Sequence, residues 1–254
     1  MNKLERAISL TMSDDMNNMY SHCDSEKSIE EISKMEDENT LSENSLLEKK
    51  IIFQGSNQDK LVNQLRDIRT ALNKNKSKSL IMIASMTESS GVSFFARNLA
   101  AVTAFDPSRS SLLIDCNIEN STVDSIFDLQ EQKGLLDYIF DPSLTEADII
   151  CPTGIPRYRC ITAGLSESKN EEFFTHHRFK SLLMGLKNRY SDRNIFIDSP
   201  ALLTSANARI LLDLCDQVIL VAPFGKVDGK KLEAISKMIP KEKLSGVVIN
   251  DYIG

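Results

Sequence analysis

The chain has 254 residues, of which 41% are hydrophobic, and a formal net charge of -6 at pH 7. The first 50 residues hold 12 Asp and Glu against 6 Lys and Arg, so the excess acidity belongs to this stretch and the rest of the chain is neutral overall. No basic stripe indicates nucleic-acid binding, and no apolar run reaches the roughly 18 residues that a membrane span needs.

Residues 1–55 form the first region and are rich in Ser, Asn, Asp and Glu. We expect a largely disordered acidic arm, with a short helix where Leu4, Ile8 and Met12 share one face. The arm is either a solubilising tail or a docking peptide that folds on a partner. The N-terminus has no hydrophobic signal core, and the five cysteines have no pairing or metal-binding spacing. We therefore expect a cytoplasmic protein that a partner recruits to the inner membrane face.

Residues 56–254 read as one folded domain in which apolar strands alternate with amphipathic helices. This order predicts an α/β fold, with a mostly parallel sheet covered by helices on both faces. The expected strands are 80–85, 110–117, 158–162, 194–200, 216–223 and 246–251. The expected helices are 58–73, 92–105, 134–139, 145–150, 173–190, 207–214 and 226–239.

The segment SMTESSGVS (85–93) joins the first strand to the next helix, which is where a phosphate-binding loop would lie. Such a loop uses glycines, a lysine for the phosphate charge and a Ser or Thr for Mg²⁺. Gly91 and Ser93 keep two of these features, but Val92 replaces the lysine and Ser89 replaces the first glycine. The residues that would face a nucleotide are Ser89, Ser90, Gly91, Val92, Ser93 and Phe94.

Two strands end in aspartates, LLID at Asp115 and IFID at Asp198. Ligands of parallel sheets bind at the carboxyl ends of the strands, so these carboxylates are candidates for a magnesium site with Ser93. Either aspartate could instead cap a helix. We interpret both as vestigial catalytic residues and assign no working catalytic residue.

These segments resemble the bacterial tyrosine kinases of exopolysaccharide and capsule synthesis (CpsD/CapB-like), which belong to the MinD/ParA-like group of P-loop proteins. The family pattern ASxxPGEGKSTxxxNLA corresponds to ASMTESSGVSFFARNLA (84–100), LLIDADLRRP to LLIDCNIENS (112–121), and IIDSPP to FIDSPA (196–201). The likeness covers about residues 56–254. It implies a three-layer P-loop NTPase-like fold, and LRDIRTAL (65–72) resembles the family's arginine-bearing subunit-packing helix.

The residues that differ from the family pattern are those that carry the chemistry of its ATP site. Beyond Val92 and Ser89, the loop proline is replaced by Glu88, the second aspartate by Asn117 and an arginine by Glu119. A further family aspartate corresponds to Ala206. The family implies a protein-tyrosine kinase, whereas the missing lysine predicts little or no activity, so enzymatic function is uncertain.

We therefore expect a non-catalytic regulatory or scaffold subunit of exopolysaccharide or capsule synthesis, with no cofactor or only weak ATP or ADP with Mg²⁺. The alternatives are an active ATP-dependent tyrosine autokinase that uses another cation, and a ParA/MinD-like ATPase. The expected partner is a membrane polysaccharide chain-length or export protein or an active paralogue, and a homo-oligomer is a further alternative. Residues 85–93 could also be a strand-to-helix turn that serves packing alone and binds no nucleotide.

Overall fold

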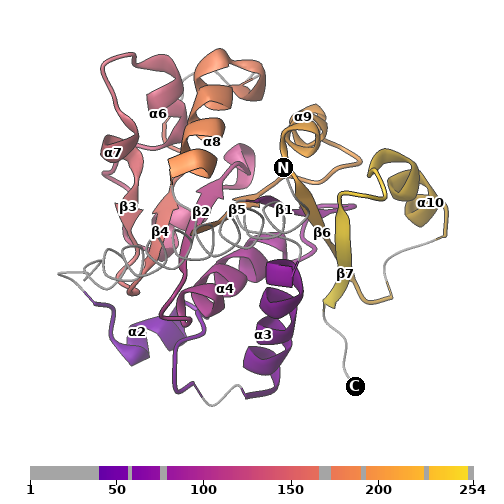
Figure 1. Cartoon of the computed structure of the whole chain (residues 1–254), viewed down its shortest axis with the longest axis horizontal. Coiled ribbons are helices and arrows are strands. Elements are labelled where there is room, and N and C mark those ends of the chain that lie inside the picture. The colour runs from indigo at the N-terminus through magenta and orange to yellow at the C-terminus, as the bar shows by residue number, and fades with distance from the viewer. Residues whose placement is uncertain are drawn as a thin grey trace, which may run out of the picture.

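A computed structural model describes residues 40–56, 59–74, 79–165, 173–189, 193–225 and 229–250. Its centre is a seven-stranded sheet in the order β3-β4-β2-β5-β1-β6-β7 (Figure 1). All neighbouring strands run parallel except β3, which pairs antiparallel with β4. The strands are β1 Leu80–Ser85, β2 Ser110–Asp115, β3 Cys151–Pro152, β4 Tyr158–Ile161, β5 Arg193–Asp198, β6 Gln217–Pro223 and β7 Leu244–Asn250.

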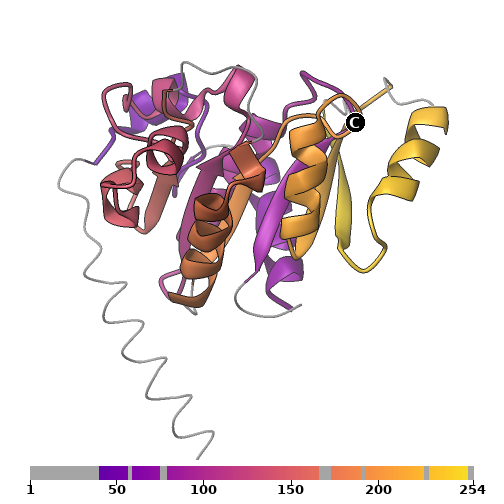
Figure 2. The ribbon, with the colours of Figure 1, turned by 90° about the horizontal axis from the view of Figure 1, so that it is seen from above.

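Helices cover both faces of the sheet, which makes three layers. In Figure 1, α3 and α4 lie below the sheet, and α8 and α9 lie above it. Seen from above in Figure 2, α8 and α9 lie side by side across the strands. The helices are α2 Glu43–Glu48, α3 Asp59–Lys74, α4 Val92–Ala104, α5 Val123–Ile126, α6 Leu135–Phe140, α7 Glu146–Ile149, α8 His177–Arg189, α9 Ala206–Leu214 and α10 Gly229–Met238. Short 3-10 turns span Ile118–Asn120 and Phe173–Thr175. The predicted α/β fold is confirmed.

The sheet divides the hydrophobic core into two layers. All six residues of β1 are buried, because a central parallel strand is covered on both faces. Met82 and Ala84 pack with α8 and α9, whereas Ile81 and Ile83 pack with α3 and α4. This alternation follows from the two-residue period of a strand, and burial on both faces explains why the first five residues of the strand, LIMIA, are all apolar.

The folded region begins earlier than the predicted boundary at residue 56. Leu46, Ile51 and Ile52 are buried in the core layer on the α4 side. The backbone N–H of Ile52 donates to Asn98 Oδ1 at 2.7 Å, and Asn98 Nδ2 donates to the carbonyl of Lys50 at 3.2 Å. The segment 41–56 is therefore part of the domain, and the expectation of disorder was wrong there. The segment is polar overall, but its few apolar side chains are buried, and the backbone beside them is hydrogen-bonded to the buried side chain of Asn98.

The expected helix over 173–190 is divided in two. A 3-10 turn ends at Thr175, and α8 begins at His177. His176 lies between them, where its Nδ1 accepts a hydrogen bond from the backbone N–H of Arg178 at 3.3 Å. A side chain that caps an N-terminus starts a new helix at that point. The other expected helices and strands match within a few residues, while α2, α5 and β3 are short elements that the sequence did not predict.

Two further expectations concern an N-terminal helix and membrane-spanning helices. The predicted helix with Leu4, Ile8 and Met12 lies outside the described residues. Within the ranges that the structure does describe, no helix has both the length and the apolar composition to cross a membrane.

Candidate functional site: a pocket at the loop between β1 and α4

The loop that joins β1 to α4 is held by its own hydroxyl groups. Ser85 and Ser90 each donate a hydrogen bond to the carbonyl of Thr87, both at 2.7 Å. Ser89 and Gly91 have positive φ angles, 55° and 84°, so the backbone turns sharply before α4 starts at Val92. Short polar side chains thus close the turn that glycines form in the family pattern.

Gly91 is required at its position for two reasons. Its φ of 84° is unfavourable for residues with a side chain. In addition, a Cβ at this position would collide with the side-chain amide of Asn250 at the end of β7. That amide donates to the carbonyl of Ser90 at 3.1 Å. The loop is therefore tied to β7, a strand about 160 residues away in sequence.

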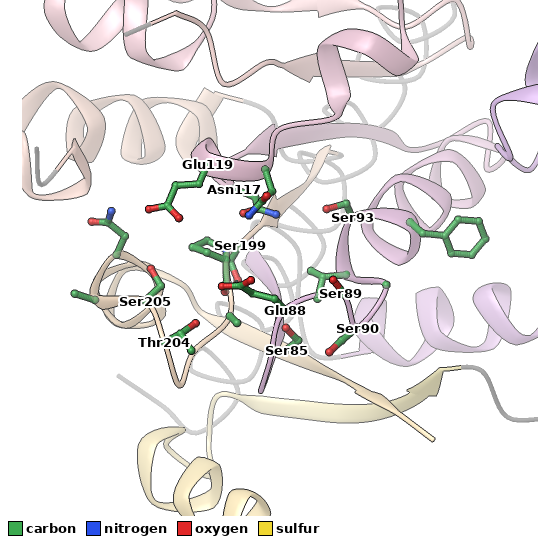
Figure 3. A pocket seen from close by; sticks show the side chains of 18 residues that line it. Ser85, Glu88, Ser89, Ser90, Ser93, Asn117, Glu119, Ser199, Thr204 and Ser205 are labelled. Carbon is green, nitrogen blue, oxygen red and sulfur yellow. The ribbon is translucent and has the colours of Figure 1, made fainter. Parts of the chain in front are cut away.

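A pocket of about 480 Å³ opens above this loop (Figure 3). All six residues predicted to face a nucleotide line it, from Ser89 to Phe94. The opposite walls come from the segment after β2, the segment after β5 and the start of α9. Those walls consist of Asn117, Glu119, Asn120, Ser199, Pro200, Ala201, Thr204, Ser205, Ala206 and Asn207. The pocket therefore lies at the carboxyl ends of the parallel strands, where the sequence places it.

The charges in the pocket have one sign. The lining contains two carboxylates, Glu88 and Glu119, and neither a lysine nor an arginine among the described residues. Figure 3 shows Glu88 reaching from the loop toward the middle of the pocket, with Glu119 and Asn117 across from it. Both glutamates are exposed, whereas the neighbouring Ser199 is buried. A ligand in this pocket meets negative charge and many hydroxyl and amide groups.

Val92 stands at the first position of α4, where the family pattern has lysine. Its side chain is only 7% exposed and packs in the core layer that includes Phe95 and Val221. The residue lines the pocket and has no charge to offer a phosphate. Phe95 is also buried, so the first turn of α4 is anchored to the sheet by apolar contacts.

Asp115 and Asp198 are neighbours at the ends of β2 and β5. They are register partners in the parallel ladder, and the N–H of Cys116 donates to the carbonyl of Asp198 at 2.9 Å. Register partners point to the same face of a sheet, with strands about 4.8 Å apart. Leu113 and Phe196, two residues earlier on each strand, pack on the α4 side, so both carboxyl groups lie on that face.

The two carboxyl groups have different surroundings. Asp115 accepts hydrogen bonds from the N–H of Asn117 at 3.1 Å, the hydroxyl of Ser121 at 2.9 Å and the N–H of Val123 at 3.3 Å. Burial nevertheless raises its pKa to about 6. Neither oxygen of Asp198 has a hydrogen-bond partner within bonding distance among the described residues. Burial, followed by the Asp115 charge, raises the pKa of Asp198 to about 8, while nearby Ser93 and Arg97 lower it in part.

Arg97 is a site residue that the sequence analysis missed. It is only 7% exposed, and its Nη1 donates to Thr122 Oγ1 at 3.0 Å while its Nε lacks a partner. Burial lowers the pKa of Arg97, whereas Tyr158, Asp198 and Asp115 raise it. The guanidinium group is thus the cation that acts on both buried aspartates from α4. A charged residue inside the apolar stretch FFARNLA was the available signal for such a role.

The predicted magnesium ligands are only partly suited to a metal ion. Ser93 lies near Asp198, which has two unpartnered oxygens, but the Asp115 carboxylate is already engaged by three hydrogen-bond donors. No group of three or more His, Cys, Asp or Glu side chains in the described ranges is arranged to hold a metal. Mg²⁺ binding by Ser93, Asp115 and Asp198 stays a prediction.

The arginine-bearing helix of the sequence analysis is α3. Arg69 is partly buried and donates from Nη1 to the carbonyl of Val102 on α4 at 3.0 Å. Arg66 is exposed and contacts Asn63 Oδ1 on its own helix at 3.4 Å. One arginine therefore fixes α3 to the domain, and the other remains at the surface.

Sequence comparisons find bacterial tyrosine kinases. The chain is 26% identical over 198 residues to the tyrosine-protein kinase ptk of Acinetobacter johnsonii, covering 76% of this chain and 26% of that protein. It is 27% identical over 178 residues to the tyrosine-protein kinase CpsD of Streptococcus agalactiae serotype III, covering 69% of this chain and 75% of CpsD. The chain thus spans about a quarter of the first relative's length and three quarters of the second's. No protein-family model matches the chain.

Solved structures show the same fold. The chimerical protein CapA2B2 superposes with a TM-score of 0.69 at 22% identity, covering 85% of this chain and 93% of that one. The kinase domain of the Escherichia coli tyrosine kinase ETK also gives 0.69 at 22% identity, covering 85% and 88%. MinD of Pyrococcus furiosus gives 0.55 at 18% identity, covering 68% and 73%. The predicted resemblance is confirmed: this chain is similar in sequence, and alike in fold, to the bacterial tyrosine kinases of capsule and exopolysaccharide synthesis.

Proposed function

We propose that this protein is a non-catalytic regulatory or scaffold subunit in exopolysaccharide or capsule synthesis, derived from a tyrosine autokinase. The observation that carries the proposal is the charge of the loop pocket. Among the residues that line it, Glu88 and Glu119 are the charged ones, and no lysine or arginine accompanies them. A nucleoside triphosphate carries several negative charges and would be placed beside two carboxylates.

The missing lysine has an energetic cost for nucleotide binding. A hydrogen bond to a charged group contributes roughly 1.5–3 kcal/mol, which corresponds to about a ten- to hundred-fold change in affinity. Loss of one donor to the transition state typically lowers a rate by about a hundred- to a thousand-fold. Repulsion by Glu88 and Glu119 adds to both effects. ATP and ADP with Mg²⁺ are therefore bound weakly or not at all, and phosphoryl transfer is lost.

The architecture around the loop supports a structural role for this region. Val92 and Phe95 bury apolar side chains against the sheet, and Asn250 fastens the loop to β7. Buried Arg97 supplies the positive charge near Asp115 and Asp198 from within the domain. These contacts stabilise the loop without a nucleotide, as a scaffold subunit requires.

The partner of such a subunit would be a membrane polysaccharide chain-length or export protein, or an active kinase paralogue. Support for this comes from the sequence relatives, which are named as tyrosine-protein kinases, one of them in a cps region. The exposed Arg66 on α3 and the acidic N-terminal stretch are the contact elements that we propose.

An autophosphorylation assay tests the proposal. The purified full chain is incubated with ATP and Mg²⁺ and probed for phosphotyrosine, with CpsD of Streptococcus agalactiae as the parallel positive sample. We expect no signal from this protein. A phosphotyrosine signal that disappears in Asp198→Ala would show an active autokinase and overturn the proposal. Affinity capture from the native host that recovers no polysaccharide-assembly protein would contradict the scaffold role.

A further inference from the structure

The loop pocket has the chemistry of a cation site. We infer that it binds an organic ammonium compound, either an aliphatic polyamine or an amino sugar. This inference rests on the proposed loss of the ATP site, because a triphosphate and an ammonium compound would compete for the same space. The volume, about 480 Å³, is within the usual range for small-molecule sites.

Charge selects the class of ligand. Glu88 and Glu119 approach the pocket from different segments, the loop after β1 and the 3-10 turn after β2, so a ligand between them meets two carboxylates (Figure 3). The first turn of α4 faces the same space, but a helix N-terminus has only roughly half a positive charge. An anion would be repelled, and an uncharged ligand would offer the two carboxylates only neutral hydrogen-bond donors, which are weaker than charged ones. An ammonium group donates hydrogen bonds to both of them.

The rest of the lining suits the remainder of such a ligand. Hydroxyl and amide side chains surround the carboxylates, and they can exchange hydrogen bonds with amines or sugar hydroxyls; they come from the segments of the two glutamates, from the segment after β5 and from the starts of α4 and α9. The apolar surfaces of Phe94 and Pro200 offer contact to carbon-bound hydrogens. The hydroxyl and amide side chains are those of Ser89, Ser93, Asn117, Asn120, Ser199, Thr204, Ser205 and Asn207.

A second and independent observation indicates a ligand at this end of the sheet. Asp198 lies behind Ser93 and Ser199, both of which line the pocket, and it is only 1% exposed. Neither of its carboxyl oxygens has a partner within hydrogen-bond distance among the described residues, and the Ser93 hydroxyl on the pocket wall is near enough to lower the pKa of the group in part. Buried polar groups are nearly always satisfied, so an unpartnered carboxyl group behind the wall points to a donor that enters from the pocket, directly or through water.

The pocket fits a single metal ion less well than it fits an organic cation. The described residues include no group of three or more His, Cys, Asp or Glu side chains that could hold one. The nearby Asp115 carboxylate is occupied by Ser121 and two backbone N–H groups. Two separated glutamates fit a ligand with more than one donor better than a single ion.

The test is equilibrium binding to the full chain by calorimetry, with spermidine, glucosamine, glucose, Mg²⁺ alone and Mg-ATP as separate probes. We expect spermidine or glucosamine to bind and glucose to fail, and the amine that binds more tightly identifies the source. The variant Glu88→Gln with Glu119→Gln should weaken that binding by at least about tenfold, because each lost charge removes a charge-assisted hydrogen bond. Both glutamates are exposed, so the variant should fold normally.

The matched control removes two charges elsewhere, by Glu43→Gln with Glu131→Gln. Both residues are exposed and outside the pocket, so binding should be unchanged. Equal loss in the control would reveal non-specific attraction to an acidic protein and overturn the inference. Equal binding of glucose, binding of Mg²⁺ without the amines, or no binding by either amine would also overturn it. Tight binding of Mg-ATP would overturn the inference too, and it alone among these outcomes would also contradict the proposed function.

Discussion

Asp115 and Asp198 sit directly opposite one another on neighbouring parallel strands, and both side chains are buried beneath α4. Asp115 receives three hydrogen bonds, whereas the oxygens of Asp198 receive none from the described residues. Arg97 is the nearby buried cation. Two acids this close in a dry interior cannot both ionise without a counter-charge, so the stability of the domain should depend on pH and on Arg97.

The first prediction concerns pH. The pKa of Asp198 is about 8 in the folded protein, against an ordinary value of 3.8. Between these values the folded state holds a proton that the unfolded chain has released. The stabilisation is therefore complete below about pH 4 and is lost as the pH rises through about 8. In urea unfolding, the free energy of unfolding should fall by at least about 1 kcal/mol between pH 5 and 8.5.

Asp198→Asn should flatten this dependence, because asparagine resembles the protonated acid and does not titrate. Asp115, with a pKa raised to about 6, would still contribute a smaller slope in the same direction. Asp213→Asn, which changes a carboxylate on α9, serves as the control and should keep the wild-type slope. A variant at Asp198 with an unchanged slope would show that this group is ionised throughout.

The second prediction concerns Arg97. Arg97→Met keeps much of the side-chain volume but removes the charge, and it should destabilise the domain by about 1–3 kcal/mol, because the buried aspartates lose their counter-ion. Above pH 8, where Asp198 is ionised, the loss should be smaller when Arg97→Met is combined with Asp198→Asn, with a coupling energy of about 1 kcal/mol in a double-mutant cycle. Arg66→Met at the exposed position should cost less than about 0.5 kcal/mol. Strict additivity at Arg97 and Asp198 would argue against an electrostatic link.

The third prediction concerns the segment 41–56. Asn98 is fully buried, and its amide group bonds to Ile52, Lys50 and Phe94. Asn98→Ala would leave buried backbone groups unsatisfied, at a cost of about 1–3 kcal/mol. Hydrogen exchange should then speed up first in residues 46–52. Asn63→Ala, at an exposed position of α3, should leave that exchange unchanged. Uniform acceleration over the whole domain would mean that this segment does not open separately.

The fourth prediction concerns the loop. Val92→Lys together with Ser89→Gly restores the phosphate-binding cation and the flexible position at a φ of 55°. We expect Mg-ATP to raise the thermal stability of this variant, since a ligand at 100 times its Kd adds about 2.7 kcal/mol. The wild type should show no shift at millimolar nucleotide. Val92→Met with Ser89→Gly provides the uncharged control, and a shift there equal to that of the lysine variant would contradict the role of the charge.

Much of this protein could be predicted from its sequence because the signals are local. The apolar runs ending at Ser85, Asp115 and Asp198 specify buried strands, and their alternation with helices specifies a parallel sheet. The loop residues from Ser89 to Phe94 line one pocket, and their proximity could be predicted because they are consecutive. The break at His176 was missed, since a side chain that accepts a bond from the helix start leaves no clear periodic trace.

Local sequence signals were enough to establish the fold class, the position of the loop and the presence of Val92 in place of its lysine, since each depends on neighbouring residues or on strand and helix periodicity. Only the tertiary structure showed that Glu88 and Glu119 share a pocket, that Arg97 serves Asp115 and Asp198, and that Asn98 fastens the segment before α3. Those relationships join residues far apart in the chain. Whether such groups meet is decided by how the helices pack on the sheet, which no local pattern encodes.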